Sequence, residues 1–416
     1  RNTRALLFWG RVPAAAKALR SRGKVGILDA VMRVLHVYKD YYPPVHGGIE
    51  VTINEMIRVT RPACREVQVL VANRELRTEV AEADGVRVTK VFDLGRLRSS
   101  PLAPTFPWWL RRCAEGMDIL HFHLPNPLAA VSYLLAKPSG KVIVHYHSDI
   151  VRQALLLRFY RPWLERFLDR ADRIIATSPN YIRSSPFLAP RAAKCTPIPF
   201  GVDLKKFGRT PEVEQEAERI RRQYGERLVL FIGKIRYYKG LQFLIEAMRE
   251  VDAHLLVIGD GPLLGSFLRQ RESLPYGERL SFLGQVPSVV PYYYAARVFC
   301  LPSFLRSEAF AVVQIEAAAC GLPVVNTRID SGVPFVSPDG VSGLTVEPRS
   351  PAALAEALNR LLSDEALRER LGRQARQRAQ EEFSIERMGE RILKVYREVL
   401  GRERSSLSLS LIHISE

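Results

Sequence analysis

The chain has 416 residues, of which 47% are hydrophobic and 25% charged, with a mean hydropathy of −0.06. This composition is globular and excludes collagen-like or wholly disordered chains, and the length indicates two or three domains. The sequence holds no run of the ~18 apolar residues that a membrane span needs, and its five scattered cysteines favour a reducing compartment over a disulfide framework or a local zinc site. The net charge of +17 suits an anionic partner, such as a nucleotide diphosphate, an acidic membrane or a nucleic acid.

The two ends of the chain differ in composition from the rest. Residues 1–31 carry seven basic side chains and one acidic one, and a strand-like run begins directly after Met32. We therefore expect residues 1–31 to be upstream or non-native sequence; their scattered charges do not fit a secretory signal, and a basic membrane-binding arm is the functional alternative. Residues 401–416 form a low-complexity tail that we expect to lie outside the fold.

Residues 32–203 alternate short apolar runs with amphipathic stretches. Strands are expected at 33–38, 67–72, 118–123, 141–146 and 173–177. This alternation is typical of βαβ units around a parallel sheet, so residues 32–203 are expected to form a Rossmann-like domain. The proline- and glycine-rich segment 197–203 reads as the connection to a second domain.

The alternation restarts over residues 204–383. Strands are expected at 228–233, 253–259, 280–283, 298–301, 323–326 and 344–346, and helices at 239–250, 308–320, 351–363 and 364–381. A last amphipathic helix over 384–400 is expected to pack back on the first domain. The predicted fold class is α/β, with two Rossmann-like domains facing a central cleft where the carboxyl ends of the strands collect ligands.

The first domain offers two candidate ligand contacts. Gly47 and Gly48 stand between a strand and a helix, where glycines let the backbone approach a ligand and helix N–H groups attract an anion; a tight turn is the alternative. His147 follows the strand 141–146 at its carboxyl end, and its near-neutral pKa suits proton handling. For His145, which alternates inward, a buried structural role is favoured.

The second domain offers cations and two carboxylates. Lys234 and Lys239 follow the strand 228–233 at the head of the next helix, which suits a diphosphate; solvated surface cations are the alternative. Glu308 and Glu316 lie eight positions apart, so on one helix they share a face about 12 Å apart. This exceeds the ~5–9.5 Å of a glycosidase pair and suits two parts of one extended ligand, such as a sugar and a ribose.

In this order and spacing the motifs resemble those of a known family. They are Gly47-Gly48, His147 in His-Ser-Asp, Ile-Pro-Phe-Gly-Val-Asp, Gly-Lys-x4-Lys-Gly, and Glu-x7-Glu followed by Cys-Gly-Leu-Pro-Val-Val. From about Met32 to Leu400 the chain resembles the retaining nucleotide-sugar glycosyltransferases of family 4, which have the GT-B fold. The resemblance implies an N-terminal acceptor domain and a C-terminal donor domain. It also implies transfer of a mannose- or glucose-type hexose from a UDP-sugar or GDP-sugar to a glycan or lipid-linked acceptor in cell-surface polysaccharide or glycolipid synthesis.

The resemblance also implies roles for single residues. His147, Glu308 and Lys239 form the implied catalytic group, with Lys239 stabilising the leaving phosphate in a front-face displacement. The implied donor-binding residues are Gly47, Gly48, Lys234, Lys239, Glu308, Phe310, Ala311 and Glu316. The family needs no cofactor or bound metal, and this sequence has no Asp-x-Asp motif.

Two positions depart from the family pattern. Lys234 stands where arginine is more common, which keeps the charge without the bidentate fork. Ala311 stands where glycine is usual. If this position needs a positive φ, alanine costs on the order of 1 kcal/mol.

The motifs say less about the acceptor substrate and the cellular location of the protein than about the donor. Trp108-Trp109 with Arg111-Arg112, and the expected helix in 151–170, mix aromatic and basic side chains. Peripheral contact with the anionic cytoplasmic face of the inner membrane is one interpretation, and core helices with snorkelling arginines are the other. The implied compartment is the cytoplasm.

Two further function classes serve as alternatives. A nucleotide-sugar epimerase or a sugar phosphorylase could share the architecture, although no lysine stands in a recognisable pyridoxal context. A basic nucleic-acid binder would show a stripe of Lys and Arg, whereas the arginines at 365–391 are interspersed with glutamates. No nucleic-acid partner is therefore expected.

Overall fold

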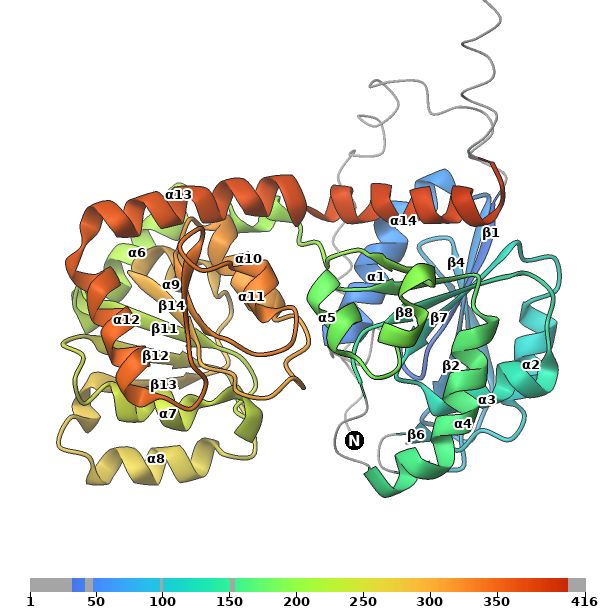
Figure 1. The fold of residues 1–416 in the computed structure, drawn as a ribbon, viewed down its shortest axis with the longest axis horizontal. Coiled ribbons are helices and arrows are strands. Elements are labelled where there is room, and N and C mark those ends of the chain that lie inside the picture. Colours follow the sequence, from blue (N-terminus) through green and yellow to red (C-terminus); the bar gives the residue numbers. More distant parts are fainter. Residues whose placement is uncertain (1–31, 42–47, 98–99, 150–153, 403–416) are drawn as a thin grey trace, which may run out of the picture.

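A computed structural model describes residues 32–41, 48–97, 100–149 and 154–402. Its first lobe is built on the strands β1 (Arg33–Val37), β2 (Glu66–Asn73), β3 (Glu79–Ala83), β4 (Val86–Phe92), β7 (Ile119–Leu124), β8 (Lys141–Tyr146), β9 (Arg173–Ala176) and β10 (Cys195–Pro197). They form one sheet in the order β10-β9-β8-β7-β1-β2-β4-β3 (Figure 1). Every pairing in it is parallel except that of β3 with β4.

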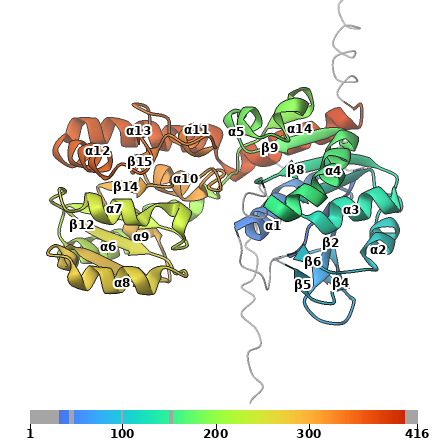
Figure 2. The same cartoon turned by 60° about the horizontal axis from the view of Figure 1, so that its bottom comes forward.

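The second lobe has its own sheet. Its strands are β11 (Leu228–Ile232), β12 (His254–Ile258), β13 (Leu280–Gly284), β14 (Val298–Leu301), β15 (Val324–Thr327) and β16 (Gly343–Val346). They are all parallel, in the order β13-β12-β11-β14-β15-β16. Near-continuous apolar runs such as Leu228–Ile232 are typical of strands covered on both faces. The two lobes remain distinct in a second view (Figure 2), and the predicted class of two Rossmann-like α/β domains is confirmed.

Helices cover both sheets. Around the first sheet lie α1 (Gly48–Thr60), α2 (Phe106–Cys113), α3 (Pro127–Ala136), α4 (Ala154–Arg170), α5 (Pro179–Ser184) and α14 (Ile385–Val399). Around the second lie α6 (Pro211–Tyr224), α7 (Leu241–Ala247), α8 (Leu264–Ser273), α9 (Val290–Ala295), α10 (Val312–Ala319), α11 (Val333–Val336), α12 (Pro351–Ser363) and α13 (Glu365–Glu382). α13 runs along the second lobe and α14 continues along the first (Figure 1).

The two faces of the first sheet bury different sets of side chains. Leu35 and Val37 of β1 pack with residues of α2, α3 and α4. Val34, one position away, packs with Met56 of α1 and Ile392 of α14. Because side chains alternate along a strand, His36 shares the face that α1 and α14 cover.

Two segments that pass between the lobes are hydrogen-bonded to each other. The Val202 N–H donates to the Phe383 carbonyl (2.9 Å), and the Ile385 N–H donates to the Val202 carbonyl (2.9 Å). A Cβ at Gly201 would lie 2.6 Å from the Ser384 carbonyl oxygen, so only glycine allows this approach. Gly201 of the Ile-Pro-Phe-Gly-Val-Asp motif is thus required where the chain crosses between the lobes.

Most expected strands lie where the sequence placed them. The sequence did not predict β3, β4 and β10 of the first sheet, nor the short strands β5 (Arg96–Leu97) and β6 (Ser100–Pro101), which form a separate two-stranded sheet. The helix expected at 239–250 is only α7, preceded by a 3-10 turn at Tyr237–Lys239. The expectation of a helix over 308–320 is wrong at its start, because α10 begins at Val312.

Candidate functional site

Each sheet has a topological switch point, at which the chain moves outward in both directions from one strand. β1 lies between β2 and β7, and β11 lies between β12 and β14. Open α/β sheets bind ligands at the carboxyl ends of such strands. The segments that follow β1, β7, β8, β11 and β14 are therefore where a site is expected.

The segment after β11 is packed tightly against the segment after β14. Gly240 has φ +72°, and a Cβ there would lie 2.0 Å from the Pro302 carbonyl oxygen, so glycine is required. The Phe304 N–H donates to the Tyr238 carbonyl (3.0 Å). These contacts bring Lys239, at the end of the 3-10 turn, to the loop that follows β14.

Lys239 and Glu308 form a buried ion pair in this place. Lys239 Nζ lies 2.6 Å from Glu308 Oε2, with 10% and 9% of the two side chains exposed. Ser303 Oγ lies 3.3 Å from the same carboxylate oxygen and donates to it. Lys234, five residues before Lys239 in the chain, is exposed to solvent. The two lysines predicted to bind the diphosphate therefore differ in burial.

The prediction that Glu308 and Glu316 share one helix face is wrong. Glu308 lies in the loop between β14 and α10, and only Glu316 is helical. Ala311, with φ +64°, is in the left-handed region at the start of α10 and prevents the helix from extending back. Phe310 is buried against Phe200 of the first lobe, with ring centroids 5.3 Å apart.

The side chain of Glu316 accepts a hydrogen bond from the neighbouring helix. Tyr293 Oη, on α9, donates to Glu316 Oε2 (2.8 Å). Burial raises the pKa of Glu316, and the Tyr293 hydrogen bond opposes that rise. The carboxylate is therefore oriented before any ligand arrives.

Five histidines gather on one face of the first sheet. His36 of β1 lies opposite His121 of β7, and His123 lies opposite His145 of β8. His147 follows β8 on the same face. All five side chains are buried, and Phe200 stacks on His147 with centroids 5.5 Å apart. Burial lowers the pKa of every one, to about 3 for His36 and His147, so the cluster is neutral at physiological pH.

Parts of this cluster could hold a metal ion. His36, His121 and His123, and also His123, His145 and His147, bring one ring nitrogen each within 4.8 Å of one another. Tetrahedral ligation requires the lone pairs, which lie in the ring planes, to converge on one point. Neighbouring rings here lie within 7–32° of parallel, and both nitrogens of His123 are in hydrogen bonds. The geometry favours imidazoles bonded to one another.

The start of α1 lies near the second lobe. Gly47 lies outside the described residues, and Gly48 is the first residue of α1. Burial raises the pKa of Glu50, in the first turn of α1, while the charges of Lys39 and Lys234 lower it. Lys234 of the second lobe thus acts electrostatically on the helix start where the sequence predicted ligand contact.

An interdomain ion pair was missed by sequence reasoning. Arg306, in the loop that carries Glu308, lies 2.9 Å from Asp149, and it donates to the Ser184 carbonyl (2.8 Å). Asp149 also accepts from Tyr146 Oη (2.9 Å). The signal was present, since Asp149 ends the His-Ser-Asp motif that contains His147.

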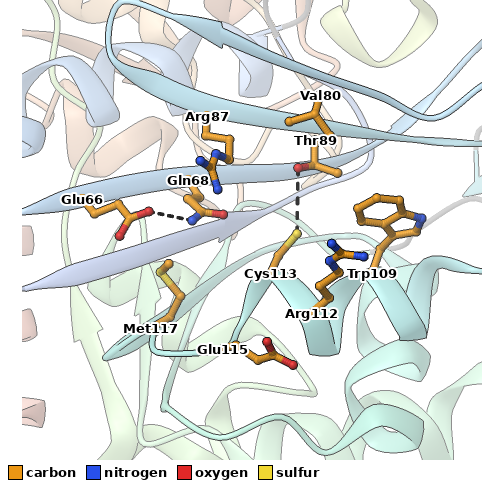
Figure 3. Close-up of a pocket in the computed structure, with 10 residues that line it drawn as sticks. All are labelled: Glu66, Gln68, Val80, Arg87, Thr89, Trp109, Arg112, Cys113, Glu115 and Met117. Atoms are coloured by element: carbon orange, nitrogen blue, oxygen red, sulfur yellow. Dashed lines mark hydrogen bonds between the residues drawn. The ribbon is translucent and has the colours of Figure 1, made fainter.

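A separate pocket of about 480 Å³ lies between α2 and the strands β2, β3 and β4 (Figure 3). Arg87 and Thr89 of β4 line it from the sheet and Arg112 and Cys113 from α2, with Cys113 Sγ 3.8 Å from Thr89 Oγ1. Gln68, also in its lining, pairs in register with Leu35 on the face away from the histidines. The pocket is therefore not part of the candidate site.

Family models match both lobes. The "Glycosyl transferase 4-like domain" model matches residues 47–201, and the "Glycosyl transferases group 1" model matches residues 212–378. O-antigen chain mannosyltransferase C of Escherichia coli is 32% identical over 374 residues, covering 89% of this chain and 99% of that protein. The chain belongs to the group 1 (family 4) glycosyltransferases.

Two other comparisons agree with this family. D-rhamnosyltransferase WbpZ of Pseudomonas aeruginosa is 34% identical over 356 residues, covering 85% of this glycosyltransferase and 92% of that one. Sucrose-phosphate synthase of Thermosynechococcus elongatus superimposes with a TM-score of 0.72 at 23% identity, over 89% of this chain and 99% of that one, which shows a shared GT-B fold. Among the described residues, no helix is both long and apolar enough to cross a bilayer.

Proposed function

We propose that this glycosyltransferase moves a mannose- or glucose-type hexose from a nucleotide diphosphate sugar to a glycan or lipid-linked acceptor, with retention and without a metal. The observation that carries the proposal is the buried Lys239–Glu308 pair at the switch point of the second sheet. The buried ammonium of Lys239 suits the phosphate of a sugar phosphate, and the buried carboxylate of Glu308 suits its sugar hydroxyls. The mannosyl and rhamnosyl activities in the names of the two curated relatives favour a mannose-type sugar.

In the proposed reaction the leaving phosphate takes the acceptor proton. Lys239 stabilises the negative charge that develops on the phosphate, and Lys234 adds an exposed cation beside it. Glu308 accepts hydrogen bonds from sugar hydroxyls, and Glu316, oriented by Tyr293, accepts them from the ribose. The backbone of Gly47 and Gly48 and of Phe310 and Ala311 completes the proposed donor contacts.

We propose that the first lobe binds the acceptor. We also propose that the helical surface of this lobe contacts an anionic membrane peripherally. Trp108 of α2 is 55% exposed beneath Arg112, whose guanidinium lies 5.3 Å from its ring. Phe159 and Trp163 of α4 are 72% and 41% exposed. Exposed aromatic and basic side chains together are typical of proteins that lie on lipid headgroups.

The reaction is tested by incubating the full chain with GDP-mannose or UDP-glucose in the presence of EDTA and a membrane extract containing lipid-linked glycans. We expect nucleoside diphosphate release from one donor and an α-configured product by NMR of the anomeric proton. A β-configured product, or release that depends on added divalent metal, would contradict the proposal. Sedimentation with phosphatidylglycerol vesicles but not phosphatidylcholine vesicles tests the membrane contact, with Phe159→Ser as the variant and the exposed Leu268→Ser of the other lobe as the matched control.

A further inference from the structure

The floor of the pocket between α2 and the strands β2, β3 and β4 is polar although it is covered (Figure 3). Leu70 of β2 and Val91 of β4 belong to the apolar core on this face of the first sheet. Two residues earlier on the same face, the strands carry Gln68 and Thr89, whose exposed fractions are only 7% and 3%. Side chains buried this deeply are mostly apolar, so packing alone does not account for a glutamine and a threonine here.

Both floor residues have hydrogen-bonding capacity to spare. Gln68 Nε2 donates to Glu66 Oε1 (2.7 Å), and the amide oxygen of Gln68 has no hydrogen-bond partner within the described residues. Thr89 Oγ1 accepts a weak contact from Cys113 Sγ (3.8 Å), and the Thr89 hydroxyl donates to no other described residue. The floor therefore offers one acceptor and one donor to a molecule in the pocket.

The charged side chains around the pocket balance one another without pairing. Arg87 of β4 and Glu115, just after α2, lie on opposite sides of the pocket (Figure 3), and Arg112 and Glu66 complete the set. In the described part of the chain, the side chains of Arg87, Arg112 and Glu115 form no ion pair and no hydrogen bond. Two guanidiniums and two carboxylates give the lining no net charge, so it favours neither an anion nor a cation. A neutral ligand that both donates and accepts hydrogen bonds suits all four groups.

One wall of the pocket is aromatic. Trp109 of α2 lines it, and the Arg112 guanidinium lies 5.7 Å from the centre of the Trp109 ring. The indole supplies a flat apolar surface beside hydrogen-bonding groups. A hexopyranose has the complementary form, because C–H groups cover its faces and hydroxyls, each both donor and acceptor, surround its edge. The pocket volume of about 480 Å³ lies within the roughly 300–1,000 Å³ of small-molecule sites.

We propose that this pocket binds one hexose unit of a neutral glycan, as a carbohydrate site separate from the site of transfer. Gln68 lies on the face of the first sheet opposite to the buried histidines, so a sugar in the pocket does not contact the reacting atoms. Such a remote contact holds the acceptor glycan equally before and during transfer, so it lowers the KM for the acceptor and leaves kcat unchanged. The role toward the acceptor rests on the proposed function, whereas the binding of a glycan does not.

Saturation-transfer NMR of the full chain with linear mannotetraose, a neutral glycan, tests the site. Gln68→Leu removes the floor acceptor beside the apolar core and is expected to raise the Kd about 10-fold, in line with the loss of one oriented hydrogen bond. Trp109→Ala is expected to abolish binding. The matched control is Gln377→Leu, because exposed Gln377 on α13 also donates to a glutamate, Glu381 (2.9 Å); its Kd should change less than about two-fold.

Three results would overturn the proposal: no binding by wild-type protein, an unchanged Kd in folded Gln68→Leu, or displacement of mannotetraose by millimolar inorganic phosphate. The last result would identify an anion site instead.

Kinetics with the lipid-linked glycans of the membrane extract then test the role toward the acceptor. We expect Gln68→Leu to raise the KM for the acceptor about 10-fold, with kcat within two-fold of wild type. A fall in kcat at an unchanged KM would contradict a remote binding contact. Mannotetraose binding by a protein that transfers no sugar from any donor would contradict the proposed function and leave the carbohydrate site standing.

Discussion

Lys239 Nζ lies 2.6 Å from Glu308 Oε2, and this pair joins the segment after β11 to the segment after β14. Each side chain is about nine-tenths buried, so each supplies the other's counter-charge when no ligand is bound. A buried ion left without its partner costs several kcal/mol, whereas a buried pair removed as a whole costs little. Comparing single variants with the double variant can therefore measure the interaction between Lys239 and Glu308.

Lys239→Met is expected to lower the free energy of unfolding by about 3 kcal/mol, because it leaves the Glu308 carboxylate buried and unpaired. Adding Glu308→Gln removes that charge and is expected to restore most of the loss. Urea unfolding of the two single variants and the double variant measures the coupling. Additive losses would show that the two side chains do not interact in solution.

Ala311→Gly is expected to stabilise the protein by up to about 1 kcal/mol. Ala311 has φ +64°, a conformation that costs a non-glycine residue about 1–2 kcal/mol, partly offset by the greater chain entropy that glycine brings to the unfolded state. The matched control is Ala317→Gly, inside α10, where glycine is expected to destabilise by about 1 kcal/mol or more. Shifts of the same sign at both positions would argue against a left-handed Ala311.

Arg306→Ala is expected to weaken the contact between the lobes. It leaves the carboxylate of Asp149, 7% exposed, without its cation and removes the hydrogen bonds to Ser184. A cost of about 2 kcal/mol corresponds to a fall of roughly 4–8 °C in melting temperature, and we expect a higher KM for the donor because the same loop carries Glu308. Arg328→Ala, which breaks an exposed pair with Glu347, is the control and should change stability by less than about 0.5 kcal/mol.

The buried histidine cluster predicts a steep loss of stability in acid. Burial lowers the pKa of all five histidines, so below their ordinary value of 6.5 the unfolded chain binds protons that the folded chain does not. The free energy of unfolding therefore reaches its full value above the ordinary histidine pKa of 6.5 and decreases as the pH falls below it. Five such groups give a slope of up to about 7 kcal/mol per pH unit. Melting temperatures from pH 7.5 to 5 measure this slope, which His145→Phe should reduce by about one fifth; a flat profile through pH 6 would contradict the buried, neutral cluster.

The sequence was sufficient for the architecture because its signals are local. Apolar runs such as 228–233 and 298–301 are bounded by polar residues and glycines, and they became β11 and β14 within a residue. The edge strand β3 and its neighbour β4 alternate polar and apolar residues, which is the local pattern of a half-buried strand, so the sequence held a signal for them that was not used. The helix start at 308 was misplaced because one backbone conformation, at Ala311, outweighed the helical periodicity.

The candidate site was only partly predictable for a similar reason. Lys239, Glu308 and Glu316 could be singled out by spacing, but their partners come from distant segments: Lys239 pairs with Glu308, and Glu316 with Tyr293. The histidine cluster did have a signal. His121 and His123, like His145 and His147, are two positions apart, which places each pair on one face of its strand. What the sequence could not supply was the strand order that brings both pairs beside His36.

We propose that the switch point around Lys239 and Glu308 binds the nucleotide diphosphate of the donor. The most direct test is the thermal shift of the full chain with GDP, UDP and dTDP in EDTA, beside Lys239→Ala and the matched control Lys394→Ala, an exposed lysine on α14. A ligand at ~100 times its Kd adds about 2.7 kcal/mol, which corresponds to several degrees. We predict a shift with one nucleotide that is lost in Lys239→Ala and kept in Lys394→Ala. A shift that survives in Lys239→Ala, or no shift with any of the three in folded protein, would show that Lys239 does not hold the diphosphate.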